Sequence, residues 1–469
     1  MPKLVVRGPK EFESGFDRIR RELDIQDHFP PEVRAAADAC TLKPTERLDV
    51  RDLDFVAVDP PGATDLDQAF FAQRDGDGFI VYYAIADVGA FVQPGDPIDQ
   101  EARLRGATMY SPDQRSPLHP AELSENKASL LPGVDRPALL WTLRLDAETN
   151  PTSTDFRRAT IQVREAISYA EAQRRIDENR SESLALLKAI GLGRQAREAE
   201  RGGISLNLPA QEIQRTDHGY QLTFDTSLPV EGWNAQMSLL SGMVAGQTMA
   251  DAGVGILRTL PPPKDQNLDR LKRTAEALHV EWPTGLSYPD FIRSLSPTDP
   301  ASNVVMVQAT RTFRGAGYES FNGELPDQPL HGAISSLYSH VTAPLRRLVD
   351  RFANEVLLSI YADVPVPAWA LEALDELPSI MGKTRQKESA LDRRLVDFAE
   401  SLVLEQSQGQ SFAGTVVDLT DNGESATVQI AEPAVVARIS GEGRSLAEQV
   451  EVRLETVDTE SGTVDFVVH

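Results

Sequence analysis

Short runs of apolar residues, bounded by turn residues, characterise positions 51–95 of the chain and predict β-strands there. Asp75-Gly-Asp-Gly78 supplies the turn of a hairpin between two of them. Residues 105–135 are rich in Pro and Ser, and we expect them to form a long ordered loop of the kind that is often functional. The strands are expected at residues 55–58, 68–73, 79–87, 137–146 and 160–166.

In other parts of the chain, apolar residues recur at helical spacing and predict α-helices. Residues 12–23 are amphipathic, and Pro30-Pro31 is expected to open a second short helix that runs through Cys40. Residues 234–252 are mostly apolar with small residues, as in a buried helix. The remaining helices are expected to begin near Tyr169 and to span residues 268–278, 303–314, 343–362 and 383–405.

The pattern changes after residue 405. Five short strands with turn signals between them follow in about 60 residues, which predicts a small barrel such as an OB fold. The fold class is therefore expected to be α+β, a mixed sheet surrounded by helices followed by a β-barrel. Three parts are expected: a helical segment at 1–45, a large domain at 46–405 and the barrel at 406–469.

Composition narrows the class of protein. The chain has 469 residues, of which 41% are hydrophobic and 25% charged, as in ordinary soluble globular proteins. It shows no signal peptide and no apolar run long enough to span a membrane. Cys40 is the only cysteine, which excludes an intrachain disulfide and a cysteine-based zinc site and fits the cytoplasm. The net charge of −24, taken alone, argues against a nucleic-acid partner, although local basic clusters can line a channel in an acidic protein.

The first candidate site is a cluster of carboxylates between two apolar runs. Asp59, Asp65 and Asp67 lie within nine residues, and the Pro60-Pro61-Gly62 turn returns the chain towards Asp59. Crowded carboxylates repel one another, and a divalent cation neutralises them. Ligands that are all oxygen favour Mg²⁺ or Mn²⁺ over zinc. The alternative is a polar loop in which aspartate serves as a turn former.

The second candidate is the segment Thr342-Ala-Pro-Leu-Arg-Arg347. Thr342 is a plausible N-cap, with Pro344 in the first helical turn, so Arg346 and Arg347 are expected early in a helix. There, arginine side chains and backbone N–H groups would both favour a phosphate. The alternative is a capped surface helix with two solvated arginines.

Together, these segments resemble the RNB catalytic domain of the ribonuclease II and ribonuclease R family. That family has an aspartate cluster at offsets 0, 6, 8 and 9, which fall here on Asp59, Asp65, Asp67 and Gln68. Its Thr/Ser-Pro-Ile-Arg-Arg/Lys motif is matched by residues 342–347. Tyr110-Ser-Pro, the stretch 118–124 and the Ser168-Tyr169 step resemble further family motifs, and the last barrel lies where the family has an S1-type RNA-binding OB fold. The resemblance covers residues 46–469.

The resemblance implies a hydrolytic, processive 3′→5′ exoribonuclease that converts single-stranded RNA to nucleoside 5′-monophosphates. It also implies a monomer that needs no membrane and no obligate protein partner. Mg²⁺, or Mn²⁺, would be held by Asp59, Asp65 and Asp67, with Gln68 at the fourth metal position. The residues expected to act in catalysis are Asp65, Asp67 and Arg346, with Asp67 the most sensitive of the carboxylates. The residues expected to contact RNA are Tyr110, Tyr169, Arg346 and Arg347, the last of them either a phosphate contact or a structural ion-pair partner.

The chain departs from the family pattern at Gln68, which replaces an aspartate. A glutamine offers a carbonyl oxygen to a metal but no charge, so one alternative is a catalytically impaired RNA-binding protein with this fold. Another is a metal-dependent phosphodiesterase that acts on a different nucleotide. The C-terminal barrel is also unusual for RNA binding, since residues 406–469 hold three Arg, no Lys and eleven Asp or Glu. Basic residues gather elsewhere, at Arg311 and Arg314 and at Lys383, Arg385 and Lys387 with Arg393 and Arg394 beyond them. The alternatives are solvated helix faces, which are favoured for the second group, and the lining of an RNA channel to which some of these residues are expected to contribute.

Overall fold

A mixed six-stranded sheet forms the centre of the computed structural model, which describes residues 9–206, 210–216, 219–225, 227–296, 299–420 and 423–468. The strand order is β1-β8-β2-β3-β4-β7, and β8 also pairs with β7, so five of the strands form a closed ring. β1 and β2 run parallel to β8, and the other pairs are antiparallel. The strands are β1 (Leu48–Asp49), β2 (Phe55–Val58), β3 (Gln68–Asp75), β4 (Gly78–Ala86), β7 (Asp135–Leu145) and β8 (Pro151–Ile167).

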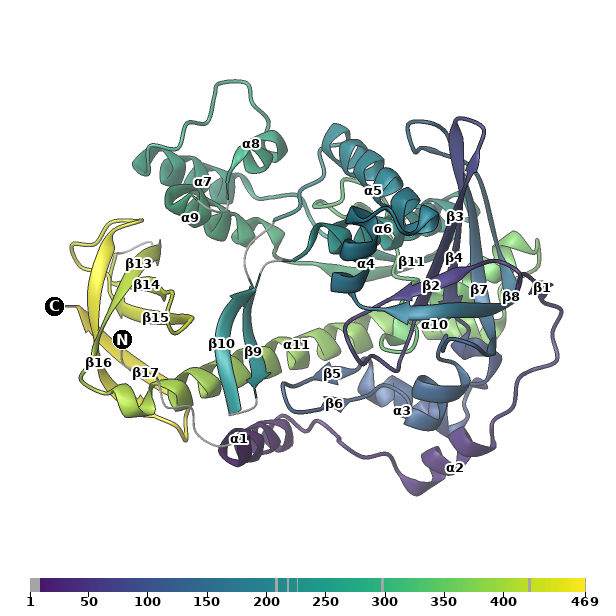
Figure 1. The fold of residues 1–469 in the computed structure, drawn as a ribbon, viewed down its shortest axis with the longest axis horizontal. Helices are drawn as coiled ribbons and strands as arrows, with labels where there is room; N and C mark the ends of the chain where they lie inside the picture. Colours follow the sequence, from purple (N-terminus) through teal and green to yellow (C-terminus); the bar gives the residue numbers. More distant parts are fainter. Residues whose placement is uncertain are drawn as a thin grey trace.

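Helices cover this sheet on both sides (Figure 1). On one side, Phe70, Trp141 and Phe156 are buried in a large apolar core shared with α5, α6 and α10. On the other side, Phe55, Leu140 and Leu345 belong to a second apolar core near α2 and α3. The helices concerned are α2 (Pro31–Ala39), α3 (Pro97–Arg105), α4 (Tyr169–Asp177), α5 (Glu182–Glu200), α6 (Pro229–Ala252) and α10 (Leu348–Tyr361).

The helix α11 (Ala368–Leu404) connects the sheet domain to the C-terminal strands (Figure 1). Its 37 residues correspond to a length of about 55 Å. Phe398, near its end, packs against Phe12 and Phe16 of α1 (Pro9–Glu22), with ring centroids 6.5 and 5.8 Å away. The first helix is therefore fastened to the far end of the molecule by an aromatic cluster.

Five C-terminal strands form a nearly closed barrel of the OB type, as the sequence predicts. The sheet order is β15-β14-β13-β16-β17, and alternate residues such as Val428, Val452 and Leu454 fill its interior. The strands are β13 (Ser411–Leu419), β14 (Ser425–Ile430), β15 (Val435–Ser440), β16 (Gln449–Asp458) and β17 (Thr463–Val468).

Smaller elements complete the large domain. They are two hairpins, β5 (Met109–Tyr110) with β6 (Arg115–Ser116) and β9 (Ala210–Thr216) with β10 (Gly219–Asp225), the pair β11 (Val254–Thr259) and β12 (Gly317–Asn322), and the helices α7 (Asp265–Ala277), α8 (Tyr288–Ser294) and α9 (Pro300–Ala309). Single turns lie at η1 (Val88–Ala90), η2 (Leu123–Lys127), η3 (Thr310–Phe313) and η4 (Glu405–Ser407). No helix in the described parts of the chain has the length and apolar character needed to cross a membrane.

The structure corrects three expectations about elements. The helix expected at 343–362 begins at Leu348, so residues 343–347 are not helical. The strand expected at 160–166 is the end of the 17-residue β8. The helix expected at 383–405 is the second half of α11, which passes through Pro378 without ending. In contrast, β2 spans the expected residues, and β3, β4 and β7 differ from expectation by at most two residues at an end.

Candidate active site

The three aspartates lie where β2 ends and β3 begins. Asp59 follows β2, and its backbone N–H donates to the carbonyl of Ile167 at 3.1 Å. The predicted turn is present, since the N–H of Ala63 donates to the carbonyl of Pro60 at 3.2 Å and Gly62 has a φ of 81°. Because β2 and β3 are neighbours in the sheet, the connection must return the chain, which brings Asp65 and Asp67 back towards Asp59.

Asp67 is the most buried member of the cluster, with 5% of its surface exposed. Its Oδ1 accepts a hydrogen bond from the N–H of Leu345 at 2.8 Å. Its Oδ2 lies 3.4 Å from Nε of Arg346. The aspartate cluster and the segment 342–347 therefore meet at the carboxylate of Asp67. Asp67 and Leu345 are 278 positions apart in the chain.

Hydrogen bonds to residues 106–108, which are distant in the sequence, hold the segment that precedes α10. The N–H of Thr108 donates to the carbonyl of Arg346 at 2.9 Å, and the N–H of Leu348 donates to that of Gly106 at 3.0 Å. Arg347 has the N-cap position that was expected for Thr342, because the helix begins only at Leu348. The predicted role of helical N–H groups beside Arg346 is therefore wrong, and Arg346 lies on a non-helical segment with its side chain about half exposed.

Arg347 forms an ion pair with the buried carboxylate of Asp350. Its Nε and one terminal nitrogen lie 2.5 and 2.9 Å from the oxygens of Asp350, which is fully buried. Asp350 also accepts a hydrogen bond from the N–H of Ala343 at 2.7 Å. Of the two alternatives for Arg347, this geometry favours the structural ion-pair partner.

Replacing Arg347 with methionine is expected to lower the free energy of unfolding by about 3–5 kcal/mol, because Asp350 would remain buried without its partner. The measurement is urea denaturation, with Arg157→Met as the control. Arg157 forms an exposed pair with Asp155 and should cost at most about 1 kcal/mol. Equal losses in the two variants would contradict a structural role for the Arg347–Asp350 pair.

Burial raises the pKa of two of the three carboxyl groups. Desolvation, opposed by Arg346 and aided by Asp65, raises the pKa of Asp59 to about 7. Desolvation likewise raises the pKa of Asp67 to about 8, against the opposing effects of Arg346 and the Leu345 N–H. Asp65 instead forms an ion pair with Arg115, which also lies 2.8 Å from Glu125. The positive charge of Arg346 acts to lower the pKa of both Asp59 and Asp67.

This donor set fits a hard divalent cation. Asp59 and Asp67 are removed from water without enough positive charge to keep their pKa values low, and an added cation would supply that charge. Asp65 is near enough to raise the pKa of both. Among the described residues, however, no three Asp, Glu, His or Cys side chains are gathered closely enough to form a finished metal cage. Asp59, Asp65 and Asp67 are thus brought into one electrostatic cluster, in which Asp65 is engaged with Arg115.

The raised pKa values predict how stability depends on pH in the presence of a chelator. Between about pH 4 and pH 8 the folded protein keeps protons on Asp59 and Asp67 that the unfolded chain has released. The free energy of unfolding should therefore fall as the pH rises through this window. Urea denaturation of Asp67→Asn should show a weaker fall than that of the unchanged protein, whereas the exposed control Asp52→Asn should not. An unchanged slope in Asp67→Asn would contradict the expected titration.

Gln68 is held by the protein at both ends of its amide. Its Nε2 donates to the carbonyl of Thr342 at 2.8 Å, and its Oε1 accepts from the hydroxyl of Tyr83 and, at 3.3 Å, from that of Ser238. Tyr83 and Ser238 are themselves 2.8 Å apart. Gln68 therefore links β3 to the Arg346 segment and to α6. The carbonyl oxygen that was expected to serve as a fourth metal ligand is already occupied by these two hydroxyls.

Replacing Gln68 with alanine is expected to destabilise the protein by about 1–3 kcal/mol, because the partners Tyr83, Ser238 and Thr342 would lose their hydrogen bonds in a part-buried site. Gln73→Ala is the matched control, since Gln73 lies on the same strand and is exposed. Thermal or urea denaturation of both variants gives the comparison. If the two variants were equally stable, Gln68 would not act as a structural link.

The two tyrosines lie near different aspartates of the cluster. Tyr110, in the β5–β6 hairpin, is 48% exposed, and burial of its hydroxyl near Arg346, Asp65 and Asp67 raises its pKa to about 12. Tyr169 begins α4, capped by Ser168, and burial together with the charge of Asp59 raises its pKa. Both aromatic rings thus border the carboxylate cluster.

Sequence reasoning missed the residues that hold this site in place. Arg115 follows Tyr110 in the same hairpin, and its position beside Asp65 has no signal in the local sequence. Tyr83 and Ser238 were read only as parts of a strand and a buried helix. Asp350 could have been found, because an acidic residue three positions after Arg347 is at helical spacing.

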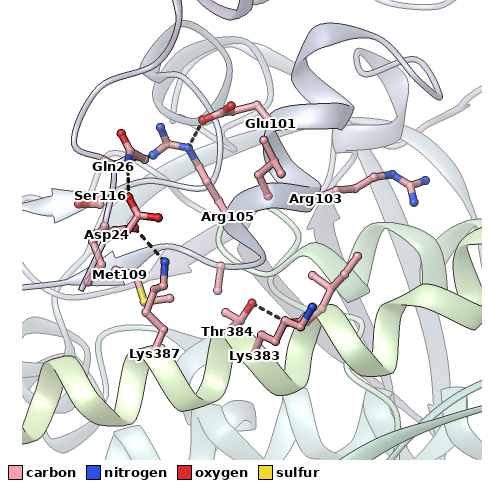
Figure 2. Close-up of a pocket in the computed structure, with 14 residues that line it drawn as sticks. Asp24, Gln26, Glu101, Arg103, Arg105, Met109, Ser116, Lys383, Thr384 and Lys387 are labelled. Carbon is pink, nitrogen blue, oxygen red and sulfur yellow. Dashed lines mark hydrogen bonds and ion pairs between the residues drawn. The ribbon is translucent and has the colours of Figure 1, made fainter. Parts of the chain in front are cut away.

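Two of the predicted basic clusters line cavities. A cavity of about 870 Å³ beside α7 and η3 is lined by Arg311 and Arg314 together with Lys264, Arg270 and Arg273. Arg311 pairs there with Asp418 of the C-terminal barrel. A cavity of about 720 Å³ between α3 and α11 is lined by Lys383 and Lys387 (Figure 2). Arg385 lines a third cavity, of about 300 Å³, which reaches Tyr110 and Arg346.

Residues 47–363 match the RNB domain, and residues 410–469 match the RNase II-type exonuclease C-terminal S1 domain. The chain belongs to the RNB family. This confirms the resemblance seen in the sequence, together with the α+β fold and the S1-type C-terminal barrel. The division of the chain at residues 45 and 405 stays a prediction.

Three proteins illustrate the range of similarity. The mouse exosome complex exonuclease RRP44 is 31% identical over 68% of this chain and 35% of its own length. The structure of Mycoplasma genitalium RNase R in complex with ribose-methylated single-stranded RNA superimposes with a TM-score of 0.87 at 21% identity, over 98% of this chain and 78% of that one. The structure of yeast Ssd1, a pseudonuclease, gives a TM-score of 0.74 at 17% identity, over 94% of this chain and 57% of that one.

The nucleases of the RNB family are metal-dependent hydrolases. The chain spans about a third to two fifths of the length of the curated relatives at the head of the comparison. The solved structures share only about a fifth of their residues with this chain, so their similarity establishes the fold alone. The chemistry has to be argued from the residues of the site.

Proposed function

We propose that this RNB protein is a hydrolytic 3′→5′ exoribonuclease that degrades single-stranded RNA processively to nucleoside 5′-monophosphates. The observation that carries the proposal is the junction at Asp67, where a buried carboxylate lies 3.4 Å from Arg346 and beside Asp59 and Asp65. Buried carboxylates suit a divalent cation, and an adjacent arginine suits the phosphate that is attacked. The three aspartates would hold Mg²⁺, which supplies an activated water and stabilises the leaving oxygen when bound.

The remaining residues of the site have roles that follow from their positions. Arg346, half exposed, is free to turn towards a phosphate and to neutralise the charge that develops on it. Tyr110 and Tyr169 border the cluster and would hold the last nucleotides by stacking, which tolerates any base. Arg347 would act indirectly, because its ion pair with Asp350 holds the segment that carries Arg346.

Charge outside the site supports an RNA substrate. In a chain of net charge −24, Lys264, Arg273, Arg311 and Arg314 gather around one cavity next to the C-terminal barrel. A local basic surface of this kind attracts a phosphate backbone even when the whole protein is acidic. It also compensates for the acidic composition of the barrel itself.

The experiment uses an RNA labelled at its 5′ end, with a DNA oligomer of the same sequence beside it, in the presence of Mg²⁺. The proposal predicts that the labelled RNA shortens step by step from the 3′ end, that the released products are nucleoside 5′-monophosphates, and that the DNA persists. Internal cuts, or products that carry a 3′-phosphate, would contradict it. Cleavage of DNA at the same rate would favour a phosphodiesterase without RNA specificity.

A second candidate is a binding protein that has lost catalysis. Gln68 favours it, because the side chain at the fourth metal position carries no charge and its oxygen already accepts bonds from Tyr83 and Ser238. This candidate predicts RNA binding in chelator and no product in Mg²⁺. Gln68→Asp is the variant that would then be expected to restore cleavage.

A further inference from the structure

The cavity of about 300 Å³ reaches the candidate active site from one side. Tyr110 and Arg346 line it, whereas Asp59, Asp65, Asp67 and Tyr169 do not. The cavity therefore shares Tyr110 and Arg346 with the candidate site, and none of the three aspartates lines it. Its volume is at the lower end of the range for small-molecule sites, which suits one nucleotide better than a length of RNA.

The walls of this cavity combine positive charge with aromatic rings. Arg258 stands over the ring of Tyr318, with its guanidinium carbon 4.6 Å from the ring centroid, and donates to the carbonyl of Gly317 at 3.2 Å. The hydroxyl of Tyr318 lies 2.7 Å from Nδ1 of His340. These contacts fix the side chains before any ligand arrives, so the wall is preorganised.

Arg385 closes the cavity on the side of α11. Its terminal nitrogen donates to the carbonyl of Ala316 at 2.9 Å, and Met381 and Glu388 of the same helix also line the space. Arg258 and Arg385 face the cavity and donate to backbone carbonyls rather than to carboxylates, whereas Arg346 also lies 3.4 Å from the carboxylate of Asp67. A nucleoside monophosphate, with a dianionic phosphate and a flat base, complements such a surface.

The larger cavity between α3 and α11 adjoins this one. Ala107 and Thr384 line both. A Cβ atom at Gly106 would lie 1.9 Å from Oγ1 of Thr384, which shows how closely the 106–108 segment and α11 approach here. From this junction the larger cavity continues between Arg103 of α3 and Lys383 and Lys387 of α11 (Figure 2). The partition between the two cavities thus consists of two small side chains, with basic residues on its outer side.

We propose that the nucleoside 5′-monophosphate released at the active site is held in the cavity lined by Arg258, Tyr318 and Arg385, and that it leaves past Ala107 and Thr384 into the cavity between α3 and α11. The inference rests on the proposed exoribonuclease function. In this arrangement the product would leave through a cavity that none of the three aspartates lines, on a path separate from that of the RNA. The chain can then advance by one nucleotide without waiting for the product to leave by the same route.

The first test is the binding of adenosine 5′-monophosphate, measured by calorimetry on the whole protein without RNA. Arg385→Gln should weaken binding about tenfold or more, because it removes a charged hydrogen-bond donor from the wall. Arg393→Gln is the matched control, since it makes the same change at an exposed position of α11 that lines neither cavity. Equal affinities in the two variants, or no binding to the unchanged protein, would overturn the product site.

The exit is tested with Ala107→Leu, which enlarges a side chain at the partition. The dissociation rate of adenosine 5′-monophosphate, measured by NMR exchange broadening, should fall several-fold while Arg385→Gln should raise it. An unchanged rate in Ala107→Leu would overturn the proposed exit and leave the product site standing.

The 5′-labelled RNA assay on the unchanged protein separates this inference from the proposed function. Step-by-step shortening without binding of the monophosphate would overturn the inference alone. Binding of the monophosphate that depends on Arg385, in a protein that leaves RNA intact in every divalent metal, would overturn the product role together with the proposed function.

Discussion

Replacing Arg346 with glutamine is expected to slow the cleavage of RNA by about 10²–10³-fold. Arg346 lies 3.4 Å from Asp67 on a segment tied to Gly106 and Thr108, so its guanidinium starts from a fixed position beside the site. Glutamine keeps a polar side chain of similar reach but removes the charge that would neutralise the attacked phosphate. The measurement is the single-turnover rate of the first cut, with protein in excess over 5′-labelled RNA.

Two further variants test whether the loss of cleavage rate is specific to the arginine at position 346. Arg346→Lys should fall between the unchanged protein and Arg346→Gln, because lysine keeps the charge but cannot bind a phosphate with two parallel bonds. Arg174→Gln removes an arginine from an exposed pair on α4 and should leave the rate unchanged. A rate for Arg346→Gln within tenfold of the unchanged protein would show that Arg346 does not stabilise the transition state.

Replacing Asp67 with asparagine is expected to have the largest effect, a loss of cleavage of about 10³-fold or more. The change is nearly isosteric, and the amide oxygen can still accept the hydrogen bond from the Leu345 N–H. It removes one negative charge from the point where the metal and Arg346 would both be held. Because catalysis by a bound metal depends on the position and charge of its ligands, the loss should appear in the rate of cutting far more than in the affinity for RNA.

The rate is measured by single turnover and the affinity by a gel-shift titration of the same RNA. Asp52→Asn, an exposed change of the same chemistry, is the control and should match the unchanged protein in both. An Asp67→Asn variant that cuts at near the normal rate would remove Asp67 from the catalytic machinery. One that fails to bind RNA would show instead that the change had disturbed the fold or the binding surface.

The parts of the fold that the sequence predicted are those in which local pattern and tertiary context agree. β2 and β3 have apolar runs that end at turn residues. β2 is buried throughout, and β3 is buried or partly buried over residues 68–72 and exposed over its polar end at 73–75. In the C-terminal barrel, β14 and β15 alternate buried residues with more exposed ones along their whole length, so their periodicity is visible without a structure.

The error at residues 343–347 has a physical cause. Thr342 and Pro344 are residues that favour the start of a helix, and nothing local contradicts that pattern. Helix formation there is opposed by the bond that the Thr108 N–H donates to the carbonyl of Arg346, and by the bonds that Asp350 accepts from Ala343 and Arg347. Thr108 is far away in the chain. Asp350 is near enough to be noticed, but its burial is not visible in a short window.

In the candidate site, too, local spacing could be predicted from the sequence, whereas contacts between distant residues could not. The spacing of Asp59, Asp65 and Asp67 predicted a cluster, and in the structure Asp59 and Asp67 each lie within electrostatic range of Asp65 and of Arg346. The surroundings of Gln68 could not be predicted, since Ser238 is 170 positions further along the chain. A sequence reports which side chains are present. The contact of Gln68 with Tyr83 follows from the pairing of β3 with β4, and that of Asp65 with Arg115 from the placement of the separate β5–β6 hairpin.

The dependence of cleavage on a divalent metal tests the central claim most directly. The unchanged protein is incubated with 5′-labelled single-stranded RNA after treatment with chelator, and again after Mg²⁺ is restored. The account predicts intact RNA in chelator and a ladder that shortens from the 3′ end once Mg²⁺ returns. RNA that stays intact and bound in Mg²⁺, or that is cut equally well in chelator, would contradict a metal-dependent exoribonuclease built on Asp59, Asp65 and Asp67.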